Sequence, residues 1–390
     1  MTTSASDGLI NMGTLEVDGT VALTTNGNGA ATIVNDVGLN FAASTVGGAL
    51  SATATTGNVS QSGALTITGN STLVTSADDA TITLDDTGNA LTGALLITTN
   101  DSGSGTDGDV EIDNGTTNLV IDLSTIDGDL DLLSGGTITD TGIATVRGTL
   151  TATTDQSNKA ITLDQLAVDG AFTLAPHGTG AVTIVNDAGL NLAASTMGGT
   201  FSGTATTGNI SDSGNLTITD AATFITTAAG SNIILDQSGS GFASTVTMQA
   251  GNGSNATFGN ITFVDSAAVR LHSSAASAGD LFINASTDLA VGGNLSITAT
   301  TGNITQGAAV TVSGTSSFET MATDADITLS SANALGGAVT LTTAGSGGNV
   351  TLDNGTTALD IAASSVGGSL TLTSGHASGI TDSGTVTVGG

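Results

Sequence analysis

The sequence predicts an all-β chain that coils into a single right-handed parallel β-helix (β-solenoid) with about 20 residues per turn. Three observations lead to this prediction. The stretch Gly29–Thr68 returns at Gly180–Thr219 with 30 of 40 positions identical. Short runs in which apolar and polar residues alternate recur along the whole chain, and no stretch holds a helical period. Internal repeats of this kind are typical of solenoids, in which each turn contacts only its neighbours.

The repeated stretch keeps its apolar pattern while its side-chain volumes change. Six of the ten differences exchange one apolar residue for another, as Phe41 for Leu192 and Val59 for Ile210. Cores tolerate such exchanges when the pattern is kept. The shared apolar positions are therefore expected to face inward.

Short strands are expected wherever the alternating runs are closed by Gly, Asn, Asp or Ser. The phrase Leu65–Thr68 (LTIT) is one example, and β-branched Thr, Val and Ile dominate such runs. The alternation predicts which side chains are inside and which are outside. Buried positions are Leu65, Ile67, Leu216, Ile218 and Ile297, and exposed positions are Thr66, Thr217 and Ser296.

A larger repeat of about 71–91 residues contains roughly four turns. Its marker is Ser-Thr-Val-Gly-Gly and its relatives, at Ser44–Gly48, Ser124–Gly128, Ser195–Gly199 and Ser364–Gly368, with a degraded copy at Ser273–Gly279. A second marker, Asp113–Thr117 (DNGTT), returns at Asp353–Thr357. We interpret the chain as one continuous solenoid over residues 1–390, with approximate units 1–34, 35–112, 113–185, 186–264, 265–352 and 353–390. An array of β-sandwiches is the alternative, and it would require antiparallel hairpins.

Composition and charge exclude several classes of protein. The chain has 56 Gly, one Pro, nine Phe and no Cys, Trp or Tyr, so a thin aliphatic core without disulfides is expected. Lys and Arg number 3 against 34 Asp and Glu, for a net charge of −31. Nucleic acid is not an expected partner, because phosphate recognition needs Lys and Arg. Membrane insertion is not expected either, since no apolar run reaches the length of a spanning helix.

Three phrases of the chain resemble the repeats of filamentous haemagglutinin-type exoproteins. They are LNFAASTVGGALSATATTGNVSQSGALTITG, LDIAASSVGGSLTLTSGHASGITDSGTVTV and GGNLSITATTGNITQGAAVTVSG. Those exoproteins are very large bacterial surface proteins, exported by two-partner secretion or related routes, with right-handed parallel β-helical shafts. The resemblance implies an adhesin or matrix shaft at an extracellular or cell-surface location. Host or matrix glycans are the candidate ligands that it suggests.

A candidate calcium site lies in the acidic stretch around residues 107–131. Alternate acids on a strand project to one face, and two neighbouring turns could offer several oxygens to Ca²⁺. A solvated acidic stripe is the competing interpretation, because neither the EF-hand pattern nor the nonapeptide repeat of calcium-binding β-helices is present. The candidate ligands are Asp107, Asp109, Glu111, Asp113, Asp127, Asp129 and Asp131.

Catalysis is not expected, and no catalytic residue or cofactor is assigned. Polysaccharide lyases and hydrolases with β-helical folds use clustered acids with a basic residue or Ca²⁺. Here the basic residues are far apart in sequence, and most Asp residues sit at repeated corner positions. The bases and histidines are Arg147, Lys159, Arg270, His177, His272 and His376.

The function expected from the sequence is a non-catalytic structural shaft of a bacterial adhesin or fibre, and copies of the chain are predicted to associate end to end. A carbohydrate-binding or polysaccharide-cleaving β-helix is the alternative, followed by a calcium-dependent surface-layer protein. An ice-binding face is a further alternative, suggested by outward T-x-T pairs such as Thr66 with Thr68. Met1–Val17 lacks the features of a signal peptide, so we expect an interior piece of a longer shaft or a mature chain.

Overall fold

A computed structural model describes residues 1–100, 108–251, 259–271, 280–283 and 289–390. The chain divides into two compact units, which we call unit 1 (Met1–Ala188) and unit 2 (Gly189–Gly390). All regular elements in the described ranges are β-strands, and no helix occurs there. The all-β prediction is therefore confirmed.

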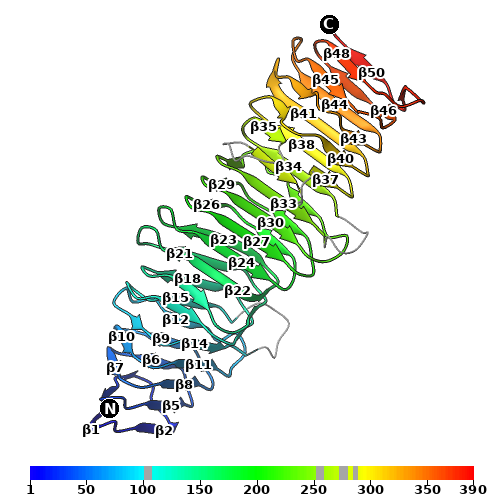
Figure 1. The fold of residues 1–390 in the computed structure, drawn as a ribbon. Coiled ribbons are helices and arrows are strands. Elements are labelled where there is room, and N and C mark those ends of the chain that lie inside the picture. The colour runs from blue at the N-terminus through cyan, green and yellow to red at the C-terminus, as the bar shows by residue number, and fades with distance from the viewer. Residues whose placement is uncertain (101–107, 252–258, 272–279, 284–288) are drawn as a thin grey trace. The chain divides into compact units, whose positions relative to one another are not determined.

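Unit 1 consists of three stacks of parallel strands (Figure 1). The first stack contains β1 (Thr2–Ser6), β4 (Thr24–Asn26), β7 (Ser44–Val46), β10 (Leu65–Ile67) and β13 (Ala90–Leu91). The second contains β2 (Ile10–Leu15), β5 (Ala31–Asn35), β8 (Leu50–Ala54), β11 (Ser71–Thr75), β14 (Leu95–Thr98), β16 (Leu119–Ile121), β17 (Ser124–Ile126), β19 (Ile138–Asp140), β20 (Ala144–Val146), β22 (Ile161–Val168) and β24 (Val182–Asn186). The third contains β3 (Thr20–Val21), β6 (Leu39–Phe41), β9 (Val59–Gln61), β12 (Ile82–Leu84), β15 (Val110–Asp113), β18 (Leu130–Ser134), β21 (Leu150–Thr154) and β23 (Ala171–Pro176).

Unit 2 is built in the same way, again from parallel pairs. One stack contains β25 (Leu190–Leu192), β28 (Ile210–Asp212), β31 (Ile233–Leu235), β34 (Ile261–Asp265), β38 (Leu295–Ala299), β41 (Ser316–Thr323), β44 (Val339–Ala344), β46 (Leu359–Ile361), β47 (Ser364–Val366), β49 (Ile380–Asp382) and β50 (Val386–Val388). A second contains β27 (Phe201–Ala205), β30 (Ala222–Thr226), β33 (Val246–Ala250), β35 (Val269–Leu271), β36 (Asp280–Ile283), β39 (Ile304–Gln306), β42 (Ile327–Leu329), β45 (Val350–Asp353) and β48 (Leu370–Thr373). Two short stacks contain β26 (Ser195–Met197), β29 (Leu216–Ile218) and β32 (Gly241–Phe242), and β37 (Leu289–Val291), β40 (Val310–Val312) and β43 (Ala334–Leu335).

Each unit is thus a parallel β-solenoid, as predicted. The described strands pair in parallel, whereas a β-sandwich would require antiparallel hairpins. The two units hold about 17 turns of roughly 21 residues each. We expected about nineteen turns from a 20-residue turn. The count is lower because some turns are longer: Ala222 pairs with Val246, and Val246 pairs with Leu281.

The inward rows follow the predicted register. Leu65, Ile67, Leu216, Ile218 and Ile297 are fully buried. Their neighbours Thr66 and Thr217 are exposed, while Ser296 is only partly exposed. Four phenylalanines stack through successive turns of unit 2, with centroid distances of 5.2 Å (Phe201–Phe224), 6.2 Å (Phe224–Phe242) and 5.1 Å (Phe242–Phe263). The thin aliphatic core is therefore reinforced at one place by aromatic contacts.

The Ser-Thr-Val-Gly-Gly marker is explained by contacts between turns. The Ser44 hydroxyl accepts a hydrogen bond from Leu23 N at 3.0 Å and donates one to Ala42 O at 2.7 Å. A Cβ atom added at Gly47 would lie 1.8 Å from Gly27 O in the preceding turn, so only glycine fits there. Ser364 and Gly367 repeat the same contacts in unit 2.

The DNGTT marker closes a tight corner. Gly115 has φ of +53°, which favours glycine, and its N–H donates to Asp113 Oδ1 at 2.8 Å. Asn114 accepts a hydrogen bond from Leu91 N (2.8 Å) and donates one to Leu91 O (3.0 Å), one turn earlier. We call this two-bond contact an asparagine clasp. It satisfies the buried donor and acceptor of one residue with a single amide.

Candidate functional site

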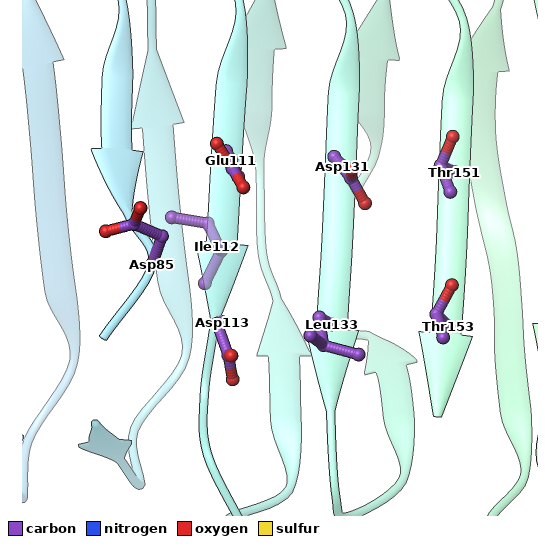
Figure 2. A pocket seen from close by; sticks show the side chains of 8 residues that line it. All are labelled: Asp85, Glu111, Ile112, Asp113, Asp131, Leu133, Thr151 and Thr153. Carbon is purple, nitrogen blue, oxygen red and sulfur yellow. The ribbon is translucent and has the colours of Figure 1, made fainter. Parts of the chain in front are cut away.

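Two of the predicted calcium ligands, Glu111 and Asp131, lie side by side on the outer face of unit 1. They occupy register-matched positions on β15 and β18, and Thr151 on β21 continues the row. A second row contains Asp113, Leu133 and Thr153, as Figure 2 shows. Both rows line a shallow pocket, whose lining residues are Asp85, Glu111, Ile112, Asp113, Asp131, Leu133, Thr151 and Thr153.

Three carboxyl groups of this acidic pocket, those of Glu111, Asp113 and Asp131, bind protons more readily than free carboxyls because the pKa of each is raised. Burial against the neighbouring strands raises the pKa of Glu111, and the charges of Asp85, Asp131 and Asp113 raise it further. Burial also raises the pKa of Asp131. For Asp113, burial raises the pKa, although the hydrogen bond from Gly115 N lowers it again. The pocket is therefore a site of mutual repulsion at neutral pH, which a cation, a proton or a hydroxylated ligand would relieve.

Asp109 and Asp129 lie at a corner of the solenoid, where their side chains accept hydrogen bonds from the backbone of the next turn. Asp109 Oδ1 accepts a hydrogen bond from Asp129 N at 2.8 Å, and Asp129 Oδ1 accepts one from Thr149 N at 2.6 Å. In unit 2, Asn209, Asn232, Asn260 and Asn294 form a similar chain, in which each side-chain oxygen accepts from the next turn. We call such a series a corner ladder. The two aspartates take the place of asparagines in a ladder and point their oxygens along the stack.

Asp127 lies apart from the acidic pocket. Its side chain is 5% exposed and forms an ion pair with Arg147 at 3.1 Å. Asp107 lies outside the described residues. The structure therefore brings together Glu111, Asp113 and Asp131 from the predicted set and assigns the other described members to contacts within the fold.

No group of three or more His, Cys, Asp or Glu side chains in the described ranges is placed to hold a metal ion. Because residues 101–107 are outside those ranges, calcium binding with Asp107 stays a prediction. Asp85 is the pocket residue that sequence reasoning missed. Asp85 directly follows β12, and β12 pairs with β15, which begins 25 residues later in the sequence. Alternation within one strand could not reveal this pairing, so it could not place Asp85 beside Glu111.

One serine and one histidine lie within hydrogen-bonding distance at a corner of unit 1. Ser157 Oγ is 3.1 Å from His177 Nδ1, and both residues are exposed. A serine nucleophile needs an oriented base and a stabilised oxyanion as well as this distance. The contact links residues one turn apart, like the corner ladders, and we assign it the same structural role.

Outward threonines form an ordered row in unit 2. Thr305, Thr328, Thr351 and Thr371 are successive register partners on β39, β42, β45 and β48. Thr66, from the T-x-T pair named from the sequence, lies on β10 in the first stack of unit 1 and is not part of this row. The described row thus combines single threonines from successive turns. In the described part of the chain, no helix is long and apolar enough to cross a membrane.

Taken together, the parallel coils and the turn-to-turn polar contacts define a repeat protein of the β-solenoid class. A family described as repeats of unknown function (DUF5649) matches the chain at residues 28–98, 107–175, 179–249, 278–342 and 347–390. These five segments cover most of the sequence, and the chain belongs to this family. A search of curated proteins and a search of solved structures each found no match.

Proposed function

We propose that the chain is a non-catalytic structural shaft of a bacterial fibre or adhesin, secreted or held at the cell surface. One observation supports this proposal above the others. The polar residues that recur from repeat to repeat are used in contacts between turns: Ser44 and Ser364 on backbone amides, Asn114 and Asn354 in clasps, and Asp109 in a corner ladder. Side chains used in this way stabilise a stack of turns, which is the property that a shaft requires.

The proposal includes a role like that of the filamentous haemagglutinin-type exoproteins, which the chain resembles in its repeated phrases. Membership of a repeat family is compatible with a shaft, because stacked repeats can be added without changing the fold. The location can be tested with antibodies against this chain and immunogold labelling of the cells that produce it. We expect label on material outside the cell envelope, and label confined to the cell interior would contradict the proposal.

End-to-end association of copies is part of the proposed role. A parallel turn offers its backbone N–H and C=O groups to the next turn, so one copy can continue the pairing of another. The net charge of −31 opposes this contact, and salt screens that repulsion. Sedimentation velocity across a salt series should therefore show larger species as the ionic strength rises. A monomer at every ionic strength would contradict end-to-end association.

A polysaccharide-cleaving or carbohydrate-binding role is the second candidate, and the acidic pocket favours it. Glycoside hydrolysis uses two carboxyl groups, one of them with a raised pKa, and Glu111 beside Asp131 offers such a pair. Incubation with acidic and neutral polysaccharides, followed by measurement of reducing ends, tests this role. Activity lost in Glu111→Gln and kept in Glu319→Gln would replace the shaft proposal, and no release of reducing ends is the result that we expect.

A further inference from the structure

Asparagine clasps recur at equivalent corners of the solenoid. In unit 1, Asn35 accepts a hydrogen bond from Val17 N at 2.9 Å and donates one to Val17 O at 3.0 Å. Asn186 makes the same pair of bonds to Val168, at 2.8 and 2.9 Å. Asn354 makes them to Leu335 in unit 2, at 2.8 and 3.2 Å. At each corner the amide is buried and supplies both an acceptor and a donor to one residue of the preceding turn.

Asp265 occupies the corresponding position in another turn of unit 2. It ends β34 as Asn35 ends β5 and Asn186 ends β24. Its side chain is 2% exposed, and its Oδ1 accepts hydrogen bonds from Phe242 N (3.4 Å), one turn earlier, and from Ala267 N (3.2 Å). An ionised carboxylate can only accept hydrogen bonds, whereas a protonated carboxyl can also donate one. The donating half of the clasp therefore requires a proton on Asp265.

The elements packed against Asp265 (β31, β32 and β38) contain no ionisable residue. In the described part of the chain, the charged residues near these elements in sequence are Asp236, which follows β31, Arg270 on β35 and Asp280 on β36. The pKa of Asp265 is shifted by burial and by backbone hydrogen bonds, and no charged side chain is among the causes.

We propose that Asp265 is a proton-operated clasp that tightens unit 2 at mildly acid pH and loosens it at neutral pH. As a neutral acid, Asp265 accepts from Phe242 N and donates its O–H to Phe242 O, in the manner of the asparagines. As a carboxylate, it loses the donating bond and places an unpaired charge in the core. This regulation is independent of what the chain binds.

The titration of Asp265 agrees in direction with this mechanism. Burial raises the pKa of Asp265 to about 6, although hydrogen bonds from the backbone N–H groups of Ala267, Phe242 and Ser266 lower it in part. The folded chain then holds the proton more tightly than the unfolded chain, whose carboxyl titrates near 3.8. Between these two values the native state binds more protons, so stability falls as the pH rises. The contribution of the clasp is full below the lower value and is lost as the pH passes the higher one.

The decisive comparison is between the parent chain and Asp265→Asn, in which an amide supplies both bonds at every pH. Urea unfolding of both proteins is measured at about pH 4.5 and about pH 7.5. We expect the unfolding constant of the parent, divided by that of the variant, to increase roughly 25-fold across this range. The exposed Asp220→Asn serves as the matched control for the removal of one negative charge. A parent-to-Asp265→Asn ratio that stays constant would overturn the proposal.

A second measurement needs no variant to fold. Carbon-13 NMR of the aspartate carboxyls in the parent chain follows Asp265 and Asp220 in one titration. The expected result is a midpoint for Asp265 well above the value near 3.8 of the unfolded carboxyl, together with a lower protection factor of the Phe242 amide at neutral pH, after correction for base-catalysed exchange. Titration of Asp265 near 3.8 would overturn the proposal.

Discussion

Replacing Asn114 with alanine provides the sharpest test of how the solenoid is held together. The change removes the clasp on Leu91 and two further bonds, to Thr117 O (3.4 Å) and Asn118 O (2.8 Å). Asn114 is fully buried, so water cannot take the place of its amide. The N–H and C=O of Leu91 would then be buried without partners, at a cost of about 1–3 kcal/mol for each group. We expect the free energy of unfolding to fall by about 4 kcal/mol.

Asn118→Ala is the matched control. Asn118 is exposed and accepts one hydrogen bond, from Thr137 N at 3.0 Å, which water can replace. Its loss should cost about 1 kcal/mol or less. Both variants are compared by urea unfolding, and amide exchange at Leu91 reports the clasp directly, because long repeat arrays need not unfold in two states. If Asn114→Ala costs no more than Asn118→Ala, the clasp does not have the structural role assigned to it.

Three further predictions concern the core, the glycine corners and cation binding. Phe224→Ala should lower the free energy of unfolding by about 3–5 kcal/mol, which is about 1 kcal/mol more than Phe318→Ala, because Phe224 contacts two other rings. Equal losses of stability in urea unfolding would show that the ring contacts add nothing. Gly47→Ala should lower the free energy of unfolding by about 2 kcal/mol or more, because the added Cβ would collide with Gly27 O. Gly13→Ala is the control: its Cβ would meet no atom within 4 Å, so stability in the same assay should be nearly unchanged. Millimolar Ca²⁺ should raise the melting temperature above that in equal Mg²⁺ if the acidic stretch binds calcium, and identical melting curves in Ca²⁺, Mg²⁺ and chelator would remove that hypothesis.

Much of the fold was predictable because one rule operates in every turn. Alternation alone placed Leu65 and Ile67 inside and Thr66 outside, since side chains on a strand point to opposite faces. Ser296 is less exposed than predicted.

The acidic pocket was only partly predictable because its geometry depends on which turns pair. Glu111 and Asp131 could be placed on one face from their spacing, but Asp85 joins them through the pairing of β12 with β15. The predicted set also included Asp109 and Asp129, whose carboxylates substitute for asparagine oxygens in a ladder. Asp and Asn accept hydrogen bonds equally well, so sequence alone did not separate a corner acid from a ligand acid.

The tight corner at Asp113–Thr117 also has a chemical consequence for the lifetime of the protein. Asn-Gly pairs are prone to deamidation, in which the glycine nitrogen attacks the asparagine side-chain carbonyl and forms a cyclic imide. Here the nitrogen of Gly115 is held by Asp113 Oδ1 at 2.8 Å, and Asp353 holds Gly355 N at the same distance. Each aspartate keeps that nitrogen from attacking the buried amide beside it, so the clasps of the folded chain are protected from this reaction. Mass spectrometry after long incubation should find that Asp113→Ala deamidates at Asn114 faster than the parent chain.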